Sequence, residues 1–115
     1  MSKEARKRLE IAMHMEAHFL KETIVVPNRH AIFKISTQEI YDVHVNMEPF
    51  CTCTDFQGRE KASKPFLACK HLYFIYVKIL GLDGKQHIII HQSTLNDNDL
   101  TFILSQPRQL IPVGL

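Results

Sequence analysis

The sequence lacks several features that define large classes of protein. No run of 18 apolar residues occurs among its 115 residues, so a membrane-spanning helix is not expected. The charged N-terminus is not followed by an apolar stretch of signal-peptide type. A Gly-rich phosphate loop, a nucleophile elbow and a paired-acid signature are all missing. Internal repeats and low-complexity tracts are absent as well. We therefore expect a protein that is not an enzyme and has no membrane partner.

Charge of one sign is also scarce. The formal net charge is +2 and the isoelectric point is near 8.5, well short of the strongly basic composition typical of nucleic-acid-binding domains. Hydrophobic residues make up 45% of the chain. A chain of this length and composition fits one domain that buries roughly two-thirds of its unfolded surface.

Cysteine is rare, and its few copies are grouped. The three cysteines all lie in one pattern, in which Cys51 and Cys53 form a Cys-x-Cys pair and Cys69 and His71 form a Cys-x-His pair. Three thiolates and one imidazole suit a tetrahedral Zn²⁺, with Zn–S near ~2.3 Å and Zn–N near ~2.0 Å. Four protein ligands leave no open position, so we expect one structural zinc ion. Cysteines in metal-ligand spacing also indicate an intracellular protein of the cytoplasm or nucleus.

The spacing within each pair indicates how it chelates. Residues two apart on a helix do not share a face, so Cys69 is expected just before or at a helix start and His71 in the first turn. The helix dipole and the amide groups there favour a thiolate. Residues two apart on a strand do share a face, so Cys51 and Cys53 are expected at a strand end or in an extended turn.

These motifs resemble the SWIM-type zinc finger, whose pattern is Cys-x-Cys, a variable gap and Cys-x-His. Residues 51–56 and 69–82 are similar to the finger and the apolar helix that follows it, and residues 33–45 are similar to the preceding strand pair. The resemblance implies a recognition module. Relatives occur beside RING domains in ubiquitin ligases, in a mitogen-activated protein kinase kinase kinase, in transposase-related proteins and in recombination mediators. No RING cysteines follow here, which suits an excised domain or a standalone relative.

The expected fold class is α+β. It has an N-terminal helix over residues 3–22, an antiparallel β-hairpin of strands 30–36 and 40–46, a long apolar helix over 70–80 ended by Gly81, and a C-terminal helix over 99–105. We divide the chain into residues 1–22 as a helix packed on the domain, 23–82 as the zinc-finger core, 83–106 as a helical extension and 107–115 as a tail. Asn96 or Asp97 is expected to cap the last helix.

Two elements leave alternatives open. In the first helix, Leu9, Met13, Ala17 and Leu20 form an apolar stripe, while other apolar residues fall outside it. Either the buried face is wide, or the helix packs on another domain or a second copy. Residues 86–91 suit a helical turn or a strand, and we favour the helical turn. Residues 106–115 are expected to form a frayed tail or a linker.

Histidines outside the finger offer weaker candidate metal ligands. His14 with His18, and His87 with His91, have the i, i+4 spacing of a helical metal pair but lack a matching carboxylate or cysteine motif, which favours exposed polar positions. His44 lies close enough in sequence to Cys51 to replace a ligand or to support one.

Basic residues mark the candidate partner-binding surface. Residues 54–68 are expected to form an exposed loop, flanked by Phe56 and Phe66 packed on the metal site. Four cations in or beside its tip could meet an acidic peptide or phosphates: Arg59, Lys61, Lys64 and Lys70. A mobile solvated tip is the simpler interpretation. We expect a module that recognises a substrate or another protein partner in ubiquitin signalling. The alternative is a DNA-associated module of a recombination mediator or transposase-related protein. The oligomeric state is left open.

Overall fold

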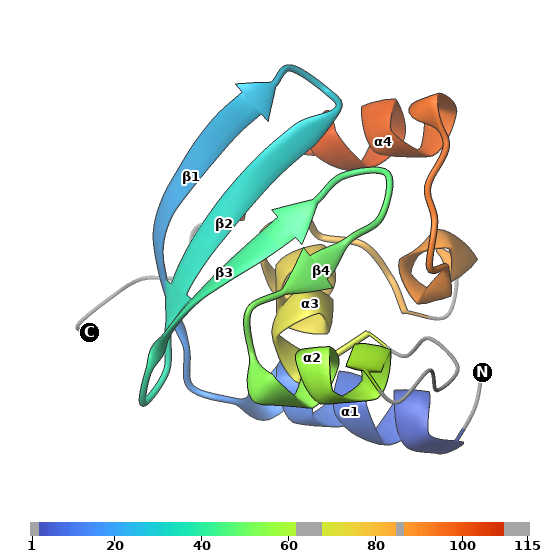
Figure 1. The fold of residues 1–115 in the computed structure, drawn as a ribbon. Helices are drawn as coiled ribbons and strands as arrows, with labels where there is room; N and C mark the ends of the chain where they lie inside the picture. Colours follow the sequence, from blue (N-terminus) through green and yellow to red (C-terminus); the bar gives the residue numbers. More distant parts are fainter. Residues whose placement is uncertain (1–2, 62–67, 85–86, 110–115) are drawn as a thin grey trace.

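Four antiparallel strands form one sheet, and helices cover one of its faces (Figure 1). The structure is a computed structural model that describes residues 3–61, 68–84 and 87–109, with the backbone alone for 59–61. The strands lie in the order β1 (His18–Val26), β2 (His30–Ser36), β3 (Ile40–Val45) and β4 (Phe50–Cys51). The helices are α1 (Lys3–His14), α2 (Thr54–Lys61), α3 (Lys70–Phe74), the π-helical turn η1 (Ile75–Ile79), the 3-10 turn η2 (Ile88–His91) and α4 (Asp97–Leu104). The expected α+β class is confirmed.

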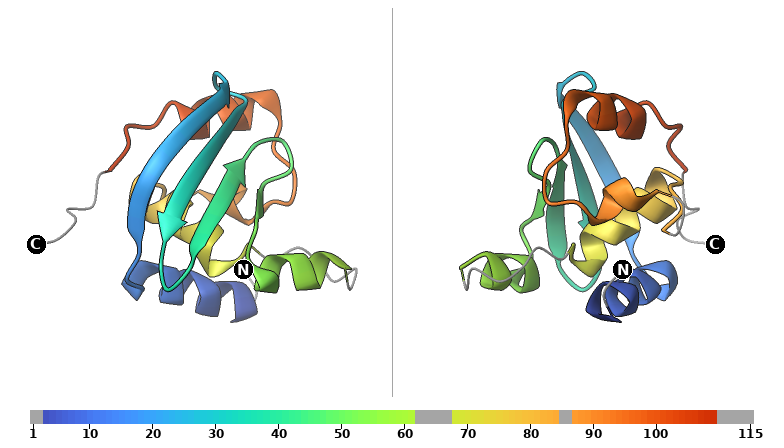
Figure 2. Two further views of the ribbon diagram at one scale, coloured as in Figure 1. Left: turned by 60° about the vertical axis from the view of Figure 1, so that its left-hand side comes forward. Right: turned by 90° about the vertical axis from the view of Figure 1, so that its right-hand side faces the viewer.

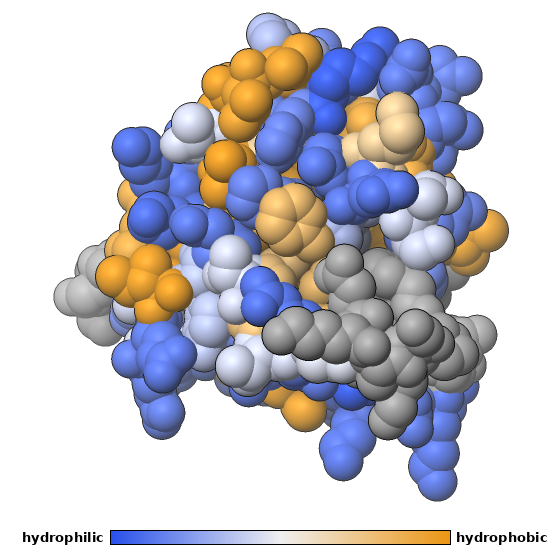
Figure 3. Space-filling view, in the orientation of Figure 1, coloured by the Kyte–Doolittle hydropathy of each residue, from blue (hydrophilic) through white to orange (hydrophobic). Residues whose placement is uncertain are grey.

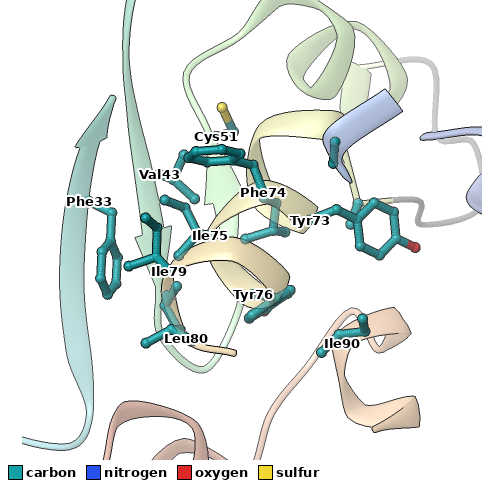
Figure 4. Packing of buried hydrophobic residues seen from close by; sticks show 14 of the residues in the cluster. Phe33, Val43, Cys51, Tyr73, Phe74, Ile75, Tyr76, Ile79, Leu80 and Ile90 are labelled. Carbon is teal, nitrogen blue, oxygen red and sulfur yellow. The ribbon is translucent and has the colours of Figure 1, made fainter. Parts of the chain in front are cut away.

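The core lies between the sheet and the segment formed by α3 and η1. Side chains alternate along β2, so that Ala31, Phe33 and Ile35 are buried, and Val43 and Val45 of β3 join them. Figure 4 shows side chains of η1 meeting these strand residues. The two further views in Figure 2 show α3, η1 and α4 on this face of the sheet, while α2 extends to the other side. Among the described residues, no helix is both long and apolar enough to cross a bilayer.

The expected N-terminal helix over residues 3–22 is too long. Helix α1 ends at His14, and β1 begins at His18. The local sequence favours helix through residue 22, but Phe19 pairs opposite Ile35 in the sheet and its ring contacts the Phe33 ring at a centroid distance of 6.0 Å. Sheet pairing and aromatic packing therefore override local propensity.

The buried face of α1 also differs from the predicted stripe. Leu9 is buried, but Met13 is 45% exposed and Leu20 is 50% exposed. The helix instead buries Ala5, Leu9 and Ala12, whose spacing of four and three suits one face, and it packs on α3. Small alanines at this contact let the two helices approach closely.

Strand β1 pairs with β2, so the sheet is larger than the expected hairpin. Strand β1 forms one edge of this sheet. Its register with β2 shifts between Phe19 and Lys21 and again between Ile24 and Val26, so the strand carries two bulges. Ile24 is 62% exposed, and Figure 3 shows apolar residues gathered over this end of the strand. Bulges of this kind discourage edge-to-edge pairing.

The expected long apolar helix over 70–80 is not one regular α-helix. The α-helical hydrogen bonding ends at Phe74, and the amide of Leu80 donates to the carbonyl of Ile75 at 2.9 Å, five residues back. Its β-branched residues are poor α-helix formers, and burial on several sides sets the conformation instead. Gly81 has φ +69°, which confirms the predicted helix stop.

The C-terminal part is better packed than predicted. The helix over 99–105 is confirmed with a shift, since α4 spans Asp97–Leu104 and Asn96 caps it in a capping box. The helical turn expected near residues 86–91 is confirmed as η2.

The frayed tail predicted over 106–115 is wrong for its described part, residues 106–109. The amide of Gln109 donates to the carbonyl of Ile79 at 2.6 Å, and the Arg108 guanidinium forms two hydrogen bonds to the Glu22 carboxylate at 2.7 and 2.9 Å. The same guanidinium lies 5.6 Å from the centre of the Phe33 ring. This segment therefore joins β1 to the core. Residues 110–115 lie outside the described residues.

Candidate metal centre

Four buried side chains converge where the end of β4 meets the starts of α2 and α3. The ligand atoms of Cys51, Cys53, Cys69 and His71 all lie within 4.8 Å of one another. The Cys51 Sγ is 3.8 Å from the His71 Nδ1. All four residues are at most 4% exposed. The two pairs identified from sequence spacing are therefore brought together into one cluster that could hold one metal ion.

The first pair lies where the chain leaves the sheet. Cys51 ends β4 and pairs opposite Val43 of β3, beside which it is drawn in Figure 4. The following residue, Thr52, donates its amide to the carbonyl of Asp42 at 3.1 Å, and its Oγ1 accepts from the Asp42 amide at 3.0 Å. Cys53 then precedes α2, whose first turn closes with the Gln57 amide donating to the Cys53 carbonyl at 3.2 Å.

The second pair has the arrangement predicted from its spacing. Cys69 is the N-cap of α3, with φ −74° and ψ 168°, and His71 lies in the first turn. The Tyr73 amide donates to the Cys69 carbonyl at 3.1 Å and closes that turn. The imidazole is thereby directed back toward the thiol of the preceding cap residue.

Helix α2 was not predicted, and it places a second helix start at the cluster. The Phe56 amide donates to the Cys53 Sγ at 3.4 Å, and the Leu72 amide donates to the Cys69 Sγ at 3.4 Å. Two sulfurs thus cap two helices in the same manner, and amide donors at helix starts favour thiolates. The stretch after Cys53, Thr-Asp-Phe-Gln, carries an acidic residue in the first turn, which was the available signal for α2.

The three thiols are electrostatically coupled. A hydrogen bond from Cys51, the largest cause, and one from Cys69 lower the pKa of the Cys53 thiol. The hydrogen bond from the Phe56 amide lowers this pKa further. The same hydrogen bond to Cys53, with a second to Cys69 and with burial, raises the pKa of the Cys51 thiol. One thiolate is therefore already favoured at Cys53, and a divalent cation would replace the remaining thiol protons.

The donor set fits a tetrahedral zinc ion. Bond lengths of ~2.3 Å to sulfur and ~2.0 Å to nitrogen place a sulfur and a nitrogen ligand about 3.5 Å apart, close to the 3.8 Å between Cys51 and His71. Soft thiolates with one imidazole are also the donors that zinc prefers. All four coordination positions are supplied by the protein, so an ion here would stabilise the fold rather than activate a water molecule.

An aromatic ring from β3 covers the histidine. The Tyr41 ring lies 4.3 Å from the His71 ring between centroids, with an interplanar angle of 32°, and its hydroxyl donates to Glu39 Oε2 at 3.2 Å. Tyr41 lies on the same face of β3 as Val43 and Val45, and the sequence gave no sign that its ring meets a candidate ligand.

The other histidines do not join the cluster. His44 lies on β3, where its Nδ1 is 2.9 Å from the His30 Nε2 and its ring stacks on Phe50 at 4.0 Å, so the suggested role as a ligand is wrong. His14 ends α1 whereas His18 begins β1, so these two do not share a helix.

The remaining histidine pair is occupied within the fold. The His87 Nδ1 accepts from the Asp83 amide at 2.7 Å. His91 lies 2.8 Å from the Tyr73 hydroxyl through Nδ1 and 3.1 Å from the Gly84 carbonyl through Nε2. Both ring nitrogens of His91 and the Nδ1 of His87 therefore have partners within the fold.

The candidate partner-binding cations lie only partly among the residues that the structure describes. Lys70 is exposed at the start of α3. Arg59 and Lys61 belong to α2, so the loop expected over 54–68 is helical up to Lys61, and Lys64 and Phe66 lie outside the described residues. Phe56 is 8% exposed and belongs to the buried cluster that also contains Cys51, Cys53 and Cys69.

Comparison with known proteins gives no family assignment for this centre. No family model, no curated protein and no solved structure matches the chain significantly.

Proposed function

We propose that this chain is a zinc-binding recognition module of the SWIM type, which has no catalysis of its own and binds a protein partner in ubiquitin signalling. The observation that carries the proposal is the buried cluster of three thiols and one imidazole, which supplies all four ligands of a tetrahedral ion. Its Cys-x-Cys and Cys-x-His order is the SWIM pattern. A reducing compartment, the cytoplasm or nucleus, suits these thiols.

A structural role for the ion follows from where its ligands lie. Cys51 ends a strand, Cys53 precedes α2, and Cys69 and His71 belong to the start of α3. One ion would therefore join the end of the sheet to the starts of two helices. Joining distant segments constrains the unfolded chain as well as the folded one, so metal binding and folding are coupled.

A role in recognition is supported by surface that the fold leaves uncovered. The face of the sheet opposite α3 and α4 carries no described helix over β2 and β3 (Figure 2). Helix α2 begins at the metal cluster and projects beside this face, and Arg59 and Lys61 lie in its C-terminal half. The ion would hold α2 against β4, so the presented surface depends on the metal.

Proximity labelling in cells tests the choice of partner class. The chain and its Cys69→Ser variant are each fused to a biotin ligase. We expect the unaltered chain to label ubiquitin-ligase subunits or ubiquitylated proteins, and the variant to lose that labelling. Direct binding to the purified partner is then measured by calorimetry. A partner set without ubiquitin-pathway proteins, or labelling that survives in the variant, contradicts the proposal.

Basic residues on α1 favour one alternative, a DNA-associated module of a recombination mediator or transposase-related protein. Lys3, Arg6 and Lys7 are exposed on this helix, which packs on the helix that begins with Lys70. Phosphate contacts release counterions, so binding to duplex DNA would fall with salt at about −0.9 in log K per contact. A protein partner held by apolar contacts gives a shallower dependence.

Two matched triple variants separate the candidate surfaces. Each removes three positive charges, and neither set contains a metal-cluster residue. The first replaces residues of the α2 region by Ala: Arg59, Lys61 and Lys64. The second replaces residues of α1 by Ala: Lys3, Arg6 and Lys7. Recognition through α2 predicts that only the first set weakens partner binding. If only the second set does so, the exposed face of α1 is the binding surface.

A further inference from the structure

The geometry of a tetrahedral ion sets a problem at the first cysteine pair. Two residues along a strand advance by about 6.6 Å, whereas two sulfur ligands of one zinc ion lie about 3.8 Å apart. The two sulfurs reach this separation only if their side chains lean together or the chain bends between them. In the structure, both Sγ atoms lie within the 4.8 Å that encloses the whole cluster. The strand ends at Cys51, and the chain bends at Thr52 and Cys53.

The Thr52 side chain produces this bend by taking the place of a backbone group. The ladder between β3 and β4 pairs Cys51 with Val43, and the next pairing would set Thr52 opposite Asp42. The Thr52 amide does donate to the Asp42 carbonyl at 3.1 Å, but the Asp42 amide donates to Thr52 Oγ1 at 3.0 Å instead of to a strand carbonyl. The hydroxyl thus ends the ladder, and the backbone can turn into α2 directly after it.

The second supporting residue lies on β3, beside the residue that Thr52 contacts. Tyr41 precedes Asp42 on β3, and its ring lies against the His71 ring at 4.3 Å between centroids and 32° between planes. The hydroxyl of Tyr41 is held at 3.2 Å by Glu39 Oε2. His71 is 4% exposed, so the Tyr41 ring is one wall of the space in which the imidazole could rotate.

We propose that Thr52 and Tyr41 are positioning residues for the metal centre, through which β3 fixes the ligands before an ion arrives. Thr52 sets the separation of the two cysteine sulfurs, and Tyr41 sets the orientation of the imidazole. This inference rests on the proposed binding of zinc. Neither residue contacts the ion, and each acts through a ligand that does.

Preorganised ligands bind an ion more tightly because less conformational freedom is lost on binding. Loss of an outer residue that orients a metal ligand costs about 10–100-fold in metal affinity. We expect Thr52→Val, which keeps the shape and removes the hydroxyl, to weaken zinc binding about 10-fold and to speed zinc release. Tyr41→Leu, which removes the ring, is expected to have an effect of similar size.

The test measures zinc affinity by competition with a chromophoric chelator, in the full chain, for the unaltered protein and each variant. Thr54→Val is the matched control, because Thr54 flanks Cys53 on its other side, is exposed and lies outside the Asp42 pair. Rescue is tested with Thr52→Ser and Tyr41→Phe, which restore the hydroxyl and the ring. Amide NMR of the zinc-loaded variants shows whether each one folds.

A second readout separates positioning from general stability. Co²⁺ replaces Zn²⁺, and its visible bands report the symmetry and ligands of the site. We expect altered d–d bands in Thr52→Val and Tyr41→Leu, and bands like those of the unaltered chain in Thr52→Ser, Tyr41→Phe and Thr54→Val. Unchanged affinity and bands in both disruptive variants would overturn the inference, as would equal loss in Thr54→Val. If the unaltered chain binds no zinc, the proposed function itself fails.

Discussion

Replacing Tyr76 by Phe should stabilise this protein, although large buried residues usually tolerate substitution badly. Tyr76 is 1% exposed, and no described group hydrogen-bonds to its hydroxyl. Burial, the largest cause, raises the pKa of Tyr76 well above its ordinary value. The side chain lies on the η1 turn within the core (Figure 4). Its hydroxyl has therefore lost hydration without gaining a partner.

The size of the effect follows from that loss. Burying an unpaired hydroxyl costs about 1–3 kcal/mol by protein mutational data. Phenylalanine fills the same space apart from one oxygen, so the packing lost is small. We expect Tyr76→Phe to raise the free energy of unfolding by about 1–2 kcal/mol, which for a domain of this size raises Tm by about 4 °C per kcal/mol.

Tyr73 provides a matched control three residues earlier. It is also 1% exposed, but its hydroxyl lies 2.8 Å from the His91 Nδ1. Tyr73→Phe should therefore lower the free energy of unfolding by about 1 kcal/mol. Both variants are measured by guanidinium unfolding with zinc in excess. A Tyr76→Phe variant that is less stable than the unaltered protein by 1 kcal/mol or more would refute the reasoning, because it would mean that the hydroxyl is hydrogen-bonded.

Three further outcomes are expected. Cys69→Ser or chelation should abolish packing around Phe56 and Leu72, and a dispersed, native-like amide NMR spectrum without zinc would rule out coupled folding. Burial, and then the charge of His30, lowers the pKa of His44 below 6.5, so its contribution to stability is present above about pH 6.5 and is lost as the pH falls. His44→Gln should therefore lessen the loss of unfolding free energy between pH 7.5 and 5.5, and an unchanged loss would contradict this assignment. Arg108→Met should cost about 1–3 kcal/mol by leaving Glu22 without its partner, as urea unfolding would measure, whereas no cost would mean that the C-terminal segment is not held there.

The features that the sequence predicted well are those fixed by local chemistry. Cys69 as a helix cap and His71 in the first turn follow from their spacing alone, and the structure has both. Alternation located β2 and most of β3, because one face of each is buried and the other is not. Gly81 and Asn96 mark helix ends through conformations and side-chain hydrogen bonds that those residue types favour.

The features that the sequence did not predict depend on contacts between distant segments. Residues 15–22 have a helix-forming composition, yet Phe19 pairs with β2 and Glu22 with Arg108, far along the chain. The start of helix α2 contains a Phe56 amide that donates to the Cys53 sulfur and an Asp55 that pairs with Arg8 of α1 at 3.4 Å, and a composition of loop-forming residues reveals neither contact. Such contacts become visible only once the chain is folded.

The metal content of the freshly purified protein tests the central claim most directly. The full chain is expressed without added chelator, and zinc per chain is measured by elemental analysis and by native mass spectrometry. Cys53→Ser, with one ligand removed, is prepared in parallel. We expect one zinc ion per chain, and reduced or absent zinc in the variant. No zinc in the unaltered protein, or two ions per chain, would contradict the claim that these four residues form a single structural zinc site.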